Sequence, residues 1–293
     1  MENNDTGVKP SSAILLIHCS DSKGIIASVS EFIFKNNGNI TNLDQHVDTS
    51  QGVFFMRIEW DLENFIIPDD KIGEYFQVLI ASKYNMQWNL HFSHYVPKMA
   101  LFVSKLPHCF YDILARWQSN EITVDIPLVI SNHKDMQPVA EQFGIPFYHF
   151  AVNGSSKKEI EEEQLALLEE YDVDFIVLAR YMQILSADFV GHFRNKIINI
   201  HHSFLPAFPG AKPYHSAFER GVKVIGATSH YVTADLDGGP IIAQDVIQVS
   251  HADSVHDLVR KGRDLEKVIL SRAIYHHLKR QTLVHQNRTI VFT

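Results

Sequence analysis

Residues 156–178 read SKKEIEEEQLALLEEYDVDFIVL, and this stretch decides the fold class. Ser156 and Glu159 have the spacing of a capping box, which predicts that a helix begins here. Its inner face follows at helical spacing and comprises Ile160, Gln164, Leu167, Leu168 and Tyr171. The residues from 175 to 178 then form a fully apolar run of strand length. A helix that leads into a strand buried on both faces is the repeating unit of a doubly wound, mainly parallel sheet.

The same alternation continues on both sides of this stretch. Four more apolar or extended runs of strand length occur, at 99–103, 126–130, 146–150 and 197–200. Helices are predicted over 110–117 and 139–143, a pair of hairpin strands over 222–232 and 241–249, and a long helix over 254–279. We therefore predict an α/β, Rossmann-like domain with a mainly parallel sheet over residues 98–293.

The first third of the chain has a different order of elements. Strands are predicted at 13–19, 39–47, 53–60 and 87–92. One helix is expected after Asp21 and Ser22, which could cap it, and a second begins at 68–70. The order is βαββαβ, so we predict a small ferredoxin-like domain over residues 13–95, with two helices covering one face of an antiparallel sheet. Residues 1–12 are polar and are expected to form a disordered leader.

Composition limits the classes of partner. Of the 293 residues, 26 are Lys or Arg and 34 are Asp or Glu, which gives a net charge of −8 and makes nucleic acid an improbable partner. No apolar run is long enough to span a membrane, and the polar N-terminus lacks a signal core. Cys19 and Cys109 are the only cysteines, and two distant thiols fit the reducing cytoplasm. We expect a cytoplasmic protein that binds neither nucleic acid nor membrane.

Several common site motifs are absent from the sequence. The patterns GxGxxG, GxxxxGK[ST], GxSxG, HExxH and CxxC do not occur, which argues against a nicotinamide site, a P-loop and a serine-hydrolase elbow. Seventeen histidines could suggest a metal. However, His201 and His202 are adjacent at a predicted strand end, so we expect them to point to opposite faces and not to share an ion. We therefore expect no metal site.

The densest polar cluster is NIHHSFLPAFPG at residues 199–210. It begins inside a predicted strand, and ligands of open α/β sheets bind beyond the carboxyl ends of strands. Asn199 and His201 are two residues apart, so their side chains share one face. An amide and an imidazole aimed at one point could stabilise a carbonyl oxygen as it becomes an oxyanion. The alternative is that both are hydrogen-bonded core residues at a strand end.

Two further clusters lie at predicted strand ends. Residues 233–240 read TADLDGGP, and Asp-Gly between two strands is the usual hairpin signal. A functional interpretation requires Asp237 to point toward Asn199 and His201, where its carboxylate could accept a proton from water. Residues 179–185, ARYMQIL, could by themselves be a simple strand-to-helix connection. Because all three clusters follow strands, we expect them to form one site.

These motifs together carry a resemblance. N-x-H-x-S-x-L-P-x-x-P-G at 199–210, followed by LDGGP at 236–240, is similar to the formyl-transfer family that uses 10-formyltetrahydrofolate, and ARYMQIL looks like its folate-binding segment. The resemblance covers about residues 98–282 and implies Asn199, His201 and Asp237 as the catalytic residues. It further implies folate contacts by Tyr181, Met182, Gln183, Leu185, His230, Thr233, Asp235 and Gly238. The folate derivative is then the substrate, and no metal or other cofactor is implied.

Residues 13–94 look like an ACT domain, a small ligand-sensing module, with DSKGIIA at 21–27 and GNI at 38–40. An ACT-like domain fused to a formyltransferase-like domain resembles the formyltetrahydrofolate deformylases. These enzymes hydrolyse 10-formyltetrahydrofolate to formate and tetrahydrofolate, which serves one-carbon metabolism and purine biosynthesis. The glycinamide-ribonucleotide transformylases of the same family carry a Gly-rich loop for the acceptor's phosphate. Here that loop, residues 103–109, reads VSKLPHC, so we expect water as the acceptor.

Two other functions remain open from the sequence. The chain could transfer the formyl group to a different amine, or it could be a sensor that binds folate without turnover. The deformylase resemblance suggests glycine and methionine as effectors, with contacts at Ser22, Ile25, Asn39 and Asn42. An isolated ACT-like sheet leaves an edge and an open face, so we expect a homo-oligomer. The alternative is that this domain serves only for dimerisation.

Overall fold

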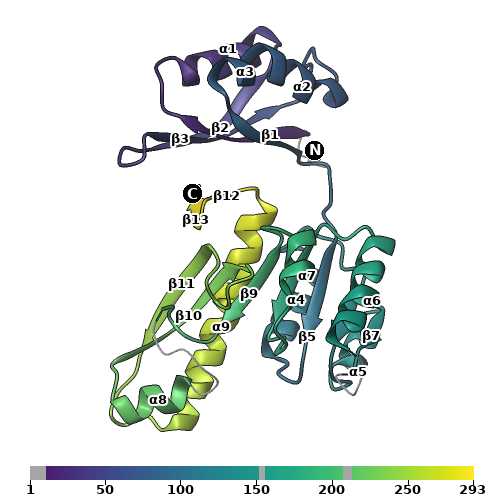
Figure 1. The fold of residues 1–293 in the computed structure, drawn as a ribbon, viewed down its shortest axis with the longest axis vertical. Coiled ribbons are helices and arrows are strands. Elements are labelled where there is room, and N and C mark those ends of the chain that lie inside the picture. Colours follow the sequence, from purple (N-terminus) through teal and green to yellow (C-terminus); the bar gives the residue numbers. More distant parts are fainter. Residues whose placement is uncertain (1–10, 152–155, 207–212) are drawn as a thin grey trace, which may run out of the picture. The chain divides into compact units, whose positions relative to one another are not determined.

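The computed structural model describes residues 11–151, 156–206 and 213–293 (Figure 1). It divides into two compact units, residues 1–95 together with Phe292 and Thr293, and residues 96–291. Most of the predicted leader, residues 1–10, lies outside the described residues, and Ser12 already belongs to the first strand. Among the helices that the structure describes, none combines the length and the apolar character needed to cross a bilayer.

The first unit has the predicted βαββαβ order. Its elements are β1 (Ser12–Ser20), α1 (Ile25–Lys35), β2 (Asn39–Asp48), β3 (Val53–Asp61), α2 (Asp69–Phe76), a π-helical turn (Gln77–Ala81), α3 (Ser82–Tyr84) and β4 (Gln87–Phe92). The sheet has the order β2-β3-β1-β4, and every neighbouring pair is antiparallel. The predicted ferredoxin-like arrangement is therefore confirmed.

The start of α1 differs from the prediction. The helix begins at Ile25, and its N-cap is Gly24, whose φ of 92° only glycine adopts readily. No side chain caps the helix, so the prediction that Asp21 and Ser22 cap it was wrong. The helix is held instead by its apolar face, which buries Ile25, Val29, Phe32 and Ile33 against the sheet.

The second unit is the predicted α/β domain. Its strands are β5 (Met99–Val103), β6 (Val129–Ser131), β7 (Phe147–His149), β8 (Phe175–Ala179), β9 (Ile197–His201), β10 (Val224–Tyr231) and β11 (Ile241–Gln248), followed by the hairpin β12 (Thr282–His285) and β13 (Arg288–Val291). Its helices are α4 (His108–Gln118), α5 (Gln137–Gln142), α6 (Lys157–Glu170), α7 (Ala187–His192), α8 (Pro213–Arg220) and α9 (Val255–Leu278). Both the capping box that starts α6 and the β10–β11 hairpin are confirmed.

The main sheet has the order β11-β10-β9-β8-β5-β6-β7. The five strands from β9 to β7 are parallel. The sheet is extended by β10, which is antiparallel to β9, and by β11, which is antiparallel to β10. The chain starts in the middle at β5, fills one side with β6 and β7, and then returns to place β8 and β9 on the other side. The order reverses between β5 and β8, and the loops after these two strands are where ligands bind in such sheets.

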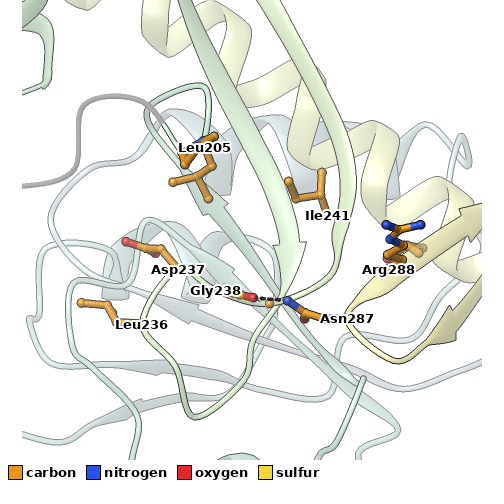
Figure 2. A pocket seen from close by; sticks show the side chains of 10 residues that line it. Leu205, Leu236, Asp237, Gly238, Ile241, Asn287 and Arg288 are labelled. Atoms are coloured by element: carbon orange, nitrogen blue, oxygen red, sulfur yellow. Dashed lines mark hydrogen bonds between the residues drawn. The ribbon is translucent and has the colours of Figure 1, made fainter.

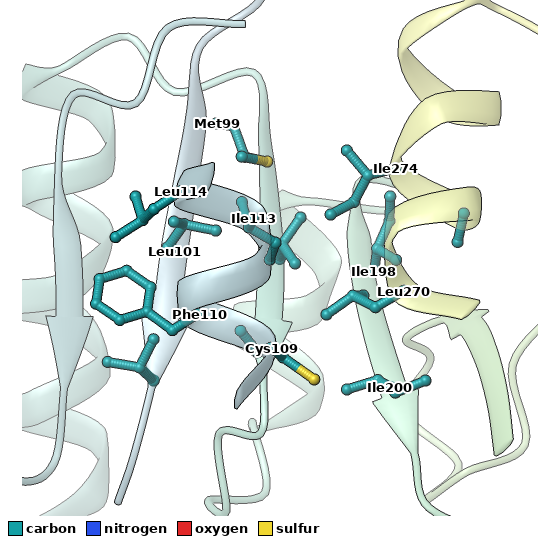
Figure 3. Close-up of a cluster of buried hydrophobic side chains, with 14 of the residues drawn as sticks. Met99, Leu101, Cys109, Phe110, Ile113, Leu114, Ile198, Ile200, Leu270 and Ile274 are labelled. Atoms are coloured by element: carbon teal, nitrogen blue, oxygen red, sulfur yellow. The ribbon is translucent and has the colours of Figure 1, made fainter. Parts of the chain in front are cut away.

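Side chains of β5 pack on both faces of the sheet. Met99, Leu101 and Val103 contact the cluster that α4 and α9 bury, whereas Ala100 and Phe102 contact the cluster beneath α6 and α7. Figure 3 shows the first of these clusters, with the labelled residues of α4 and α9 meeting those of β5 and β9. Because the strands are buried on both faces, their carboxyl ends are held rigidly, which suits them to position a site.

Candidate active site

The last strand of the parallel set presents two of the predicted residues. Asn199 and His201 both lie on β9, which ends at His201. The carbonyl of Asn199 accepts a hydrogen bond from Ser229 Oγ at 2.8 Å. The alternating residues of the strand, Ile198 and Ile200, point into the hydrophobic core. The two polar side chains therefore emerge on the same face, as the period of two predicts.

Asp237 reaches this face from the loop that joins β10 to β11. Its backbone has a φ of 54°, in the left-handed region that a short polar side chain tolerates best. Gly239 lets the loop pass close to β10, because a Cβ there would lie 1.8 Å from the carbonyl oxygen of Tyr231. As a result, Asp237 Oδ2 lies 3.3 Å from His201 Nδ1. The structure thus brings together all three residues expected to be catalytic.

His230 on β10 completes the cluster. Its Nδ1 donates to the carbonyl of Tyr231 at 2.9 Å, so its Nε2 accepts from the Asn199 amide at 3.2 Å. The same Nε2 lies 3.8 Å from Asp237 Oδ1. One carboxylate, one amide and two imidazoles therefore surround one point. Hydrogen-bonding the polar groups at a strand end would not require so many side chains to converge, so this arrangement favours a functional site.

The charge state of Asp237 follows from these contacts. Hydrogen bonding to His201, with a smaller contribution from the neighbouring His230 imidazole, holds the pKa of the Asp237 carboxyl well below its usual range, although partial burial opposes the shift. The carboxylate is therefore ionised at neutral pH. His201 Nε2 is buried and has no hydrogen-bond partner among the described residues, so this atom is available to a ligand.

A cavity of about 350 Å³ lies over this cluster. Of the residues predicted from the sequence, its lining includes Asn199, His201, Asp237, Tyr181, Met182, Gln183, Leu185, His230 and Thr233. Two predicted folate contacts are placed elsewhere. Asp235 is exposed in the turn, where its carbonyl accepts from Gly238 N and Thr233 Oγ1, and Gly238 lines a neighbouring cavity.

The neighbouring cavity, of about 690 Å³, shares Leu236 and Asp237 with the first (Figure 2). The turn between β12 and β13 forms part of its wall. There Asn287 Nδ2 donates to the carbonyl of Gly238 at 2.8 Å, drawn as the dashed line in Figure 2. The carboxyl-terminal hairpin, which the sequence did not predict, therefore anchors the loop that carries Asp237.

The loop after β5 contacts the loop after β8 at the point where the strand order reverses. Ser104 Oγ donates to Asn132 Oδ1 at 2.6 Å and accepts from the backbone N–H of Met182 at 3.1 Å. These bonds fix the start of the segment 181–185, which lines the cavity. Part of the predicted cluster 199–210, residues 207–210, lies outside the described residues.

Sequence reasoning misjudged one neighbour of the site. His201 and His202 were expected to point to opposite faces, but their rings stack with centroids 5.1 Å apart, because β9 ends at His201 and strand alternation does not extend to His202. His202 and Arg180 both line the cavity. The buried ion-pair partner of Arg180 is Glu266, which lies on the apolar stripe of α9. An acidic residue at a core position of this helix was the signal in the sequence that could have revealed it.

His108, Cys109 and Glu266 place their possible ligand atoms within 4.8 Å of one another. Glu266 already faces the Arg180 guanidinium at 3.5 Å, and burial raises the pKa of the Cys109 thiol far above its usual range. A cation would compete with the arginine and would need the thiolate, so we assign this group no metal.

Comparison with known proteins agrees with this geometry. Residues 97–274 match the Formyl transferase family. The chain is 54% identical to formyltetrahydrofolate deformylase from Synechocystis sp., over 96% of this chain and 98% of that one, and 47% identical to the Bacillus subtilis deformylase, over 95% and 93%. A crystal structure of the deformylase from Pseudomonas syringae pv. tomato superposes with a TM-score of 0.95, covering 99% of this chain and 97% of that one at 44% identity. Glycinamide ribonucleotide transformylase 1 from Symbiobacterium toebii matches 70% of this chain and 98% of its own, at 31% identity and a TM-score of 0.65.

Proposed function

This chain belongs to the formyltetrahydrofolate deformylases, hydrolases of one-carbon metabolism, and we propose that Asn199, His201 and Asp237 carry out its reaction. Water attacks the formyl carbon of 10-formyltetrahydrofolate, and formate and tetrahydrofolate are released. The observation that carries the proposal is the ionised Asp237 carboxylate beside His201, whose Nε2 is buried without a partner at the wall of the cavity.

Each side chain has a step that its chemistry suits. Asp237 accepts a hydrogen bond from the attacking water and orients it toward the formyl carbon. Its low pKa keeps it ionised but makes it a weak base, so the proton moves on through His201 to the leaving nitrogen. His201 Nε2 and the Asn199 amide stabilise the oxyanion, for which Asn199 exchanges its bond to His230.

The cavity suits a folate with its formyl group at the polar end. Tyr181, Met182 and Leu185 supply its apolar wall, and Thr233 lies on the opposite loop. We place the pterin between these two segments, because a flat heterocycle needs apolar contact and a few polar partners. Asp235 and Gly238 then act through the shape of the Asp237 loop, to which their mutual hydrogen bond contributes.

Formate release without any amine acceptor tests this function. Wild-type protein is expected to release formate from 10-formyltetrahydrofolate in buffer alone. Asp237→Asn should lose activity by about 100- to 10,000-fold while still binding the folate, because the amide keeps the shape but cannot accept the proton. Asp245→Asn, on β11 and ion-paired with Arg272, is the matched control and should retain full activity. Formate release that requires an added amine would contradict the proposal.

The first unit supplies control and assembly in this proposal. Ser22, Asn39 and Asn42 are exposed, whereas the Ile25 side chain is buried in the core, so Ile25 would contact glycine or methionine only through its backbone. β2 is an edge strand whose residues are mostly exposed, which supports pairing with a second copy. The two buried, unpaired cysteines support a cytoplasmic location.

A further inference from the structure

A buried charged cluster lies beside His201, and the reaction above does not use it. Arg180 Nη1 is 2.7 Å from His202 Nδ1, and Arg180 Nε is 3.5 Å from Glu266 Oε2. Glu266 also accepts from Tyr214 Oη at 2.6 Å and lies 2.7 Å from His108 Nε2. Arg180 and His202 are each 8% exposed and Glu266 only 1%, so these charges cannot be balanced by solvent.

The contact with Arg180 fixes the proton on His202. A guanidinium donates and never accepts, so His202 Nδ1 is the acceptor and its remaining proton lies on Nε2. Burial, and then the Arg180 charge, lower the pKa of His202 to about 4, so this ring is neutral at neutral pH. It is this neutral ring that stacks on His201, with an angle of 27° between the planes.

Glu266 offsets the charge that Arg180 brings to the site. Without the carboxylate, a buried guanidinium would itself disfavour positive charge on His201, only one ring away. Two local features accommodate Arg180 and the Tyr214–Glu266 contact. Arg180 has a φ of 63°, and Gly262 on α9 leaves space for Tyr214, whose hydroxyl would lie 2.1 Å from a Cβ at that position.

We propose that Arg180, supported by Glu266, is a positioning residue for the deformylase reaction: it holds His202 as a neutral ring stacked on His201, so that His201 can carry positive charge while bound to Asp237. The inference rests on the proposed function. The groups facing His202 are Arg180 after β8, Glu266 on α9, the Tyr214 ring on α8 and His201, with Asp237 beyond it. Of these, only Arg180 bonds a nitrogen of the His202 ring.

The pH dependence of kcat tests the proposal. In Arg180→Gln, His202 loses its permanent donor and the neighbouring positive charge, so the ring becomes protonated at a higher pH than in the wild type. A cation then stacks on His201, so kcat should fall on the acid side at a pH at least about one unit higher than in the wild type. KM for 10-formyltetrahydrofolate should change less than about threefold, because none of the folate contacts proposed above is altered. Adding His202→Gln to Arg180→Gln should abolish the new acid limb, since glutamine cannot be protonated.

Two comparisons separate this role from a structural one. Arg116→Gln breaks two ion pairs of α4 in the same unit and should leave the pH profile unchanged. If Arg180→Gln lowers kcat equally at every pH, or if the acid limb persists in the double variant, the proposal is overturned. Should Arg180→Gln fail to fold, nitrogen NMR of the intact full-length enzyme decides instead, because a protonated His202 Nδ1 at neutral pH would contradict it. Asp237→Asn reports on the proposed function independently of these variants.

Discussion

The proposed mechanism needs an Asp237 carboxylate that is ionised and points into the cavity. Its contact with His201 favours the ionised form and holds the side chain in place. Its pKa in the folded protein lies below the unfolded value of about 3.9. The carboxylate therefore contributes to stability above that pH, and this contribution is lost as the pH falls through the folded pKa. We expect Asp237→Asn to have a smaller free energy of unfolding than the wild type at neutral pH, with a gap that narrows toward about pH 3. The side chain is 29% exposed, so solvent reduces the effect. Urea unfolding at several pH values measures the gap, and a gap independent of pH would count against the ion pair.

His201 and Asn199 should affect the chemical step more than substrate binding. Their contacts with the formyl oxygen strengthen only as the oxyanion develops, so alanine at either position should lower kcat by about 100- to 1,000-fold with little change in folate affinity. Single-turnover kinetics and equilibrium binding measure the two quantities separately. A variant with unchanged kcat and weakened binding would show that its residue is a substrate contact instead.

For single residues, the sequence predicts those side-chain positions that strand alternation or a turn motif determines. The shared face of Asn199 and His201 follows from strand alternation, and the hairpin signal correctly located the loop of Asp237. His202 was misjudged because alternation stops where β9 ends. Glu266 is 64 or more positions away from every other residue of the cluster except Tyr214, so only tertiary packing reveals its role.

The element that controls the Asp237 loop is the β12–β13 hairpin. Asn287 in its turn donates to the carbonyl of Gly238, the residue next to Asp237 (Figure 2). We expect Asn287→Ala to lower kcat by about fivefold, because losing one such bond costs about 1 kcal/mol and frees the loop. Global stability should change little, since Asn287 is exposed. Steady-state kinetics with parallel thermal unfolding measure both quantities, and an unchanged kcat would mean that the loop needs no anchor.

Most long elements were predictable because each one has its own periodic pattern. The capping box of α6, the buried runs of β5 and β8 and the apolar stripe of α9 all appear in the structure. The short helices α7 and α8 and the β12–β13 hairpin were not predicted. They are at most eight residues long, and packing stabilises such short elements more than propensity does.

For the whole molecule, we propose that the second unit carries out hydrolysis and that the first unit controls it. Every residue proposed for hydrolysis lies between 178 and 289, whereas the proposed effector contacts lie before residue 43. We expect glycine or methionine to change the rate of the full-length enzyme. A chain lacking residues 1–95 should still release formate but no longer respond to either amino acid. Calorimetry of the full-length protein tests effector binding directly, and the absence of heat with unaltered rates would contradict the sensor role.

The central claim is that water, activated at Asp237, attacks the formyl carbon. A single turnover of the full-length enzyme in ¹⁸O-labelled water, without any amine, tests it most directly by mass spectrometry of the formate. Attack by water predicts one labelled oxygen in each formate molecule, and little formate from Asp237→Asn in the same time. Formate without label, or a formyl group that stays on the folate until an amine is added, would contradict the mechanism.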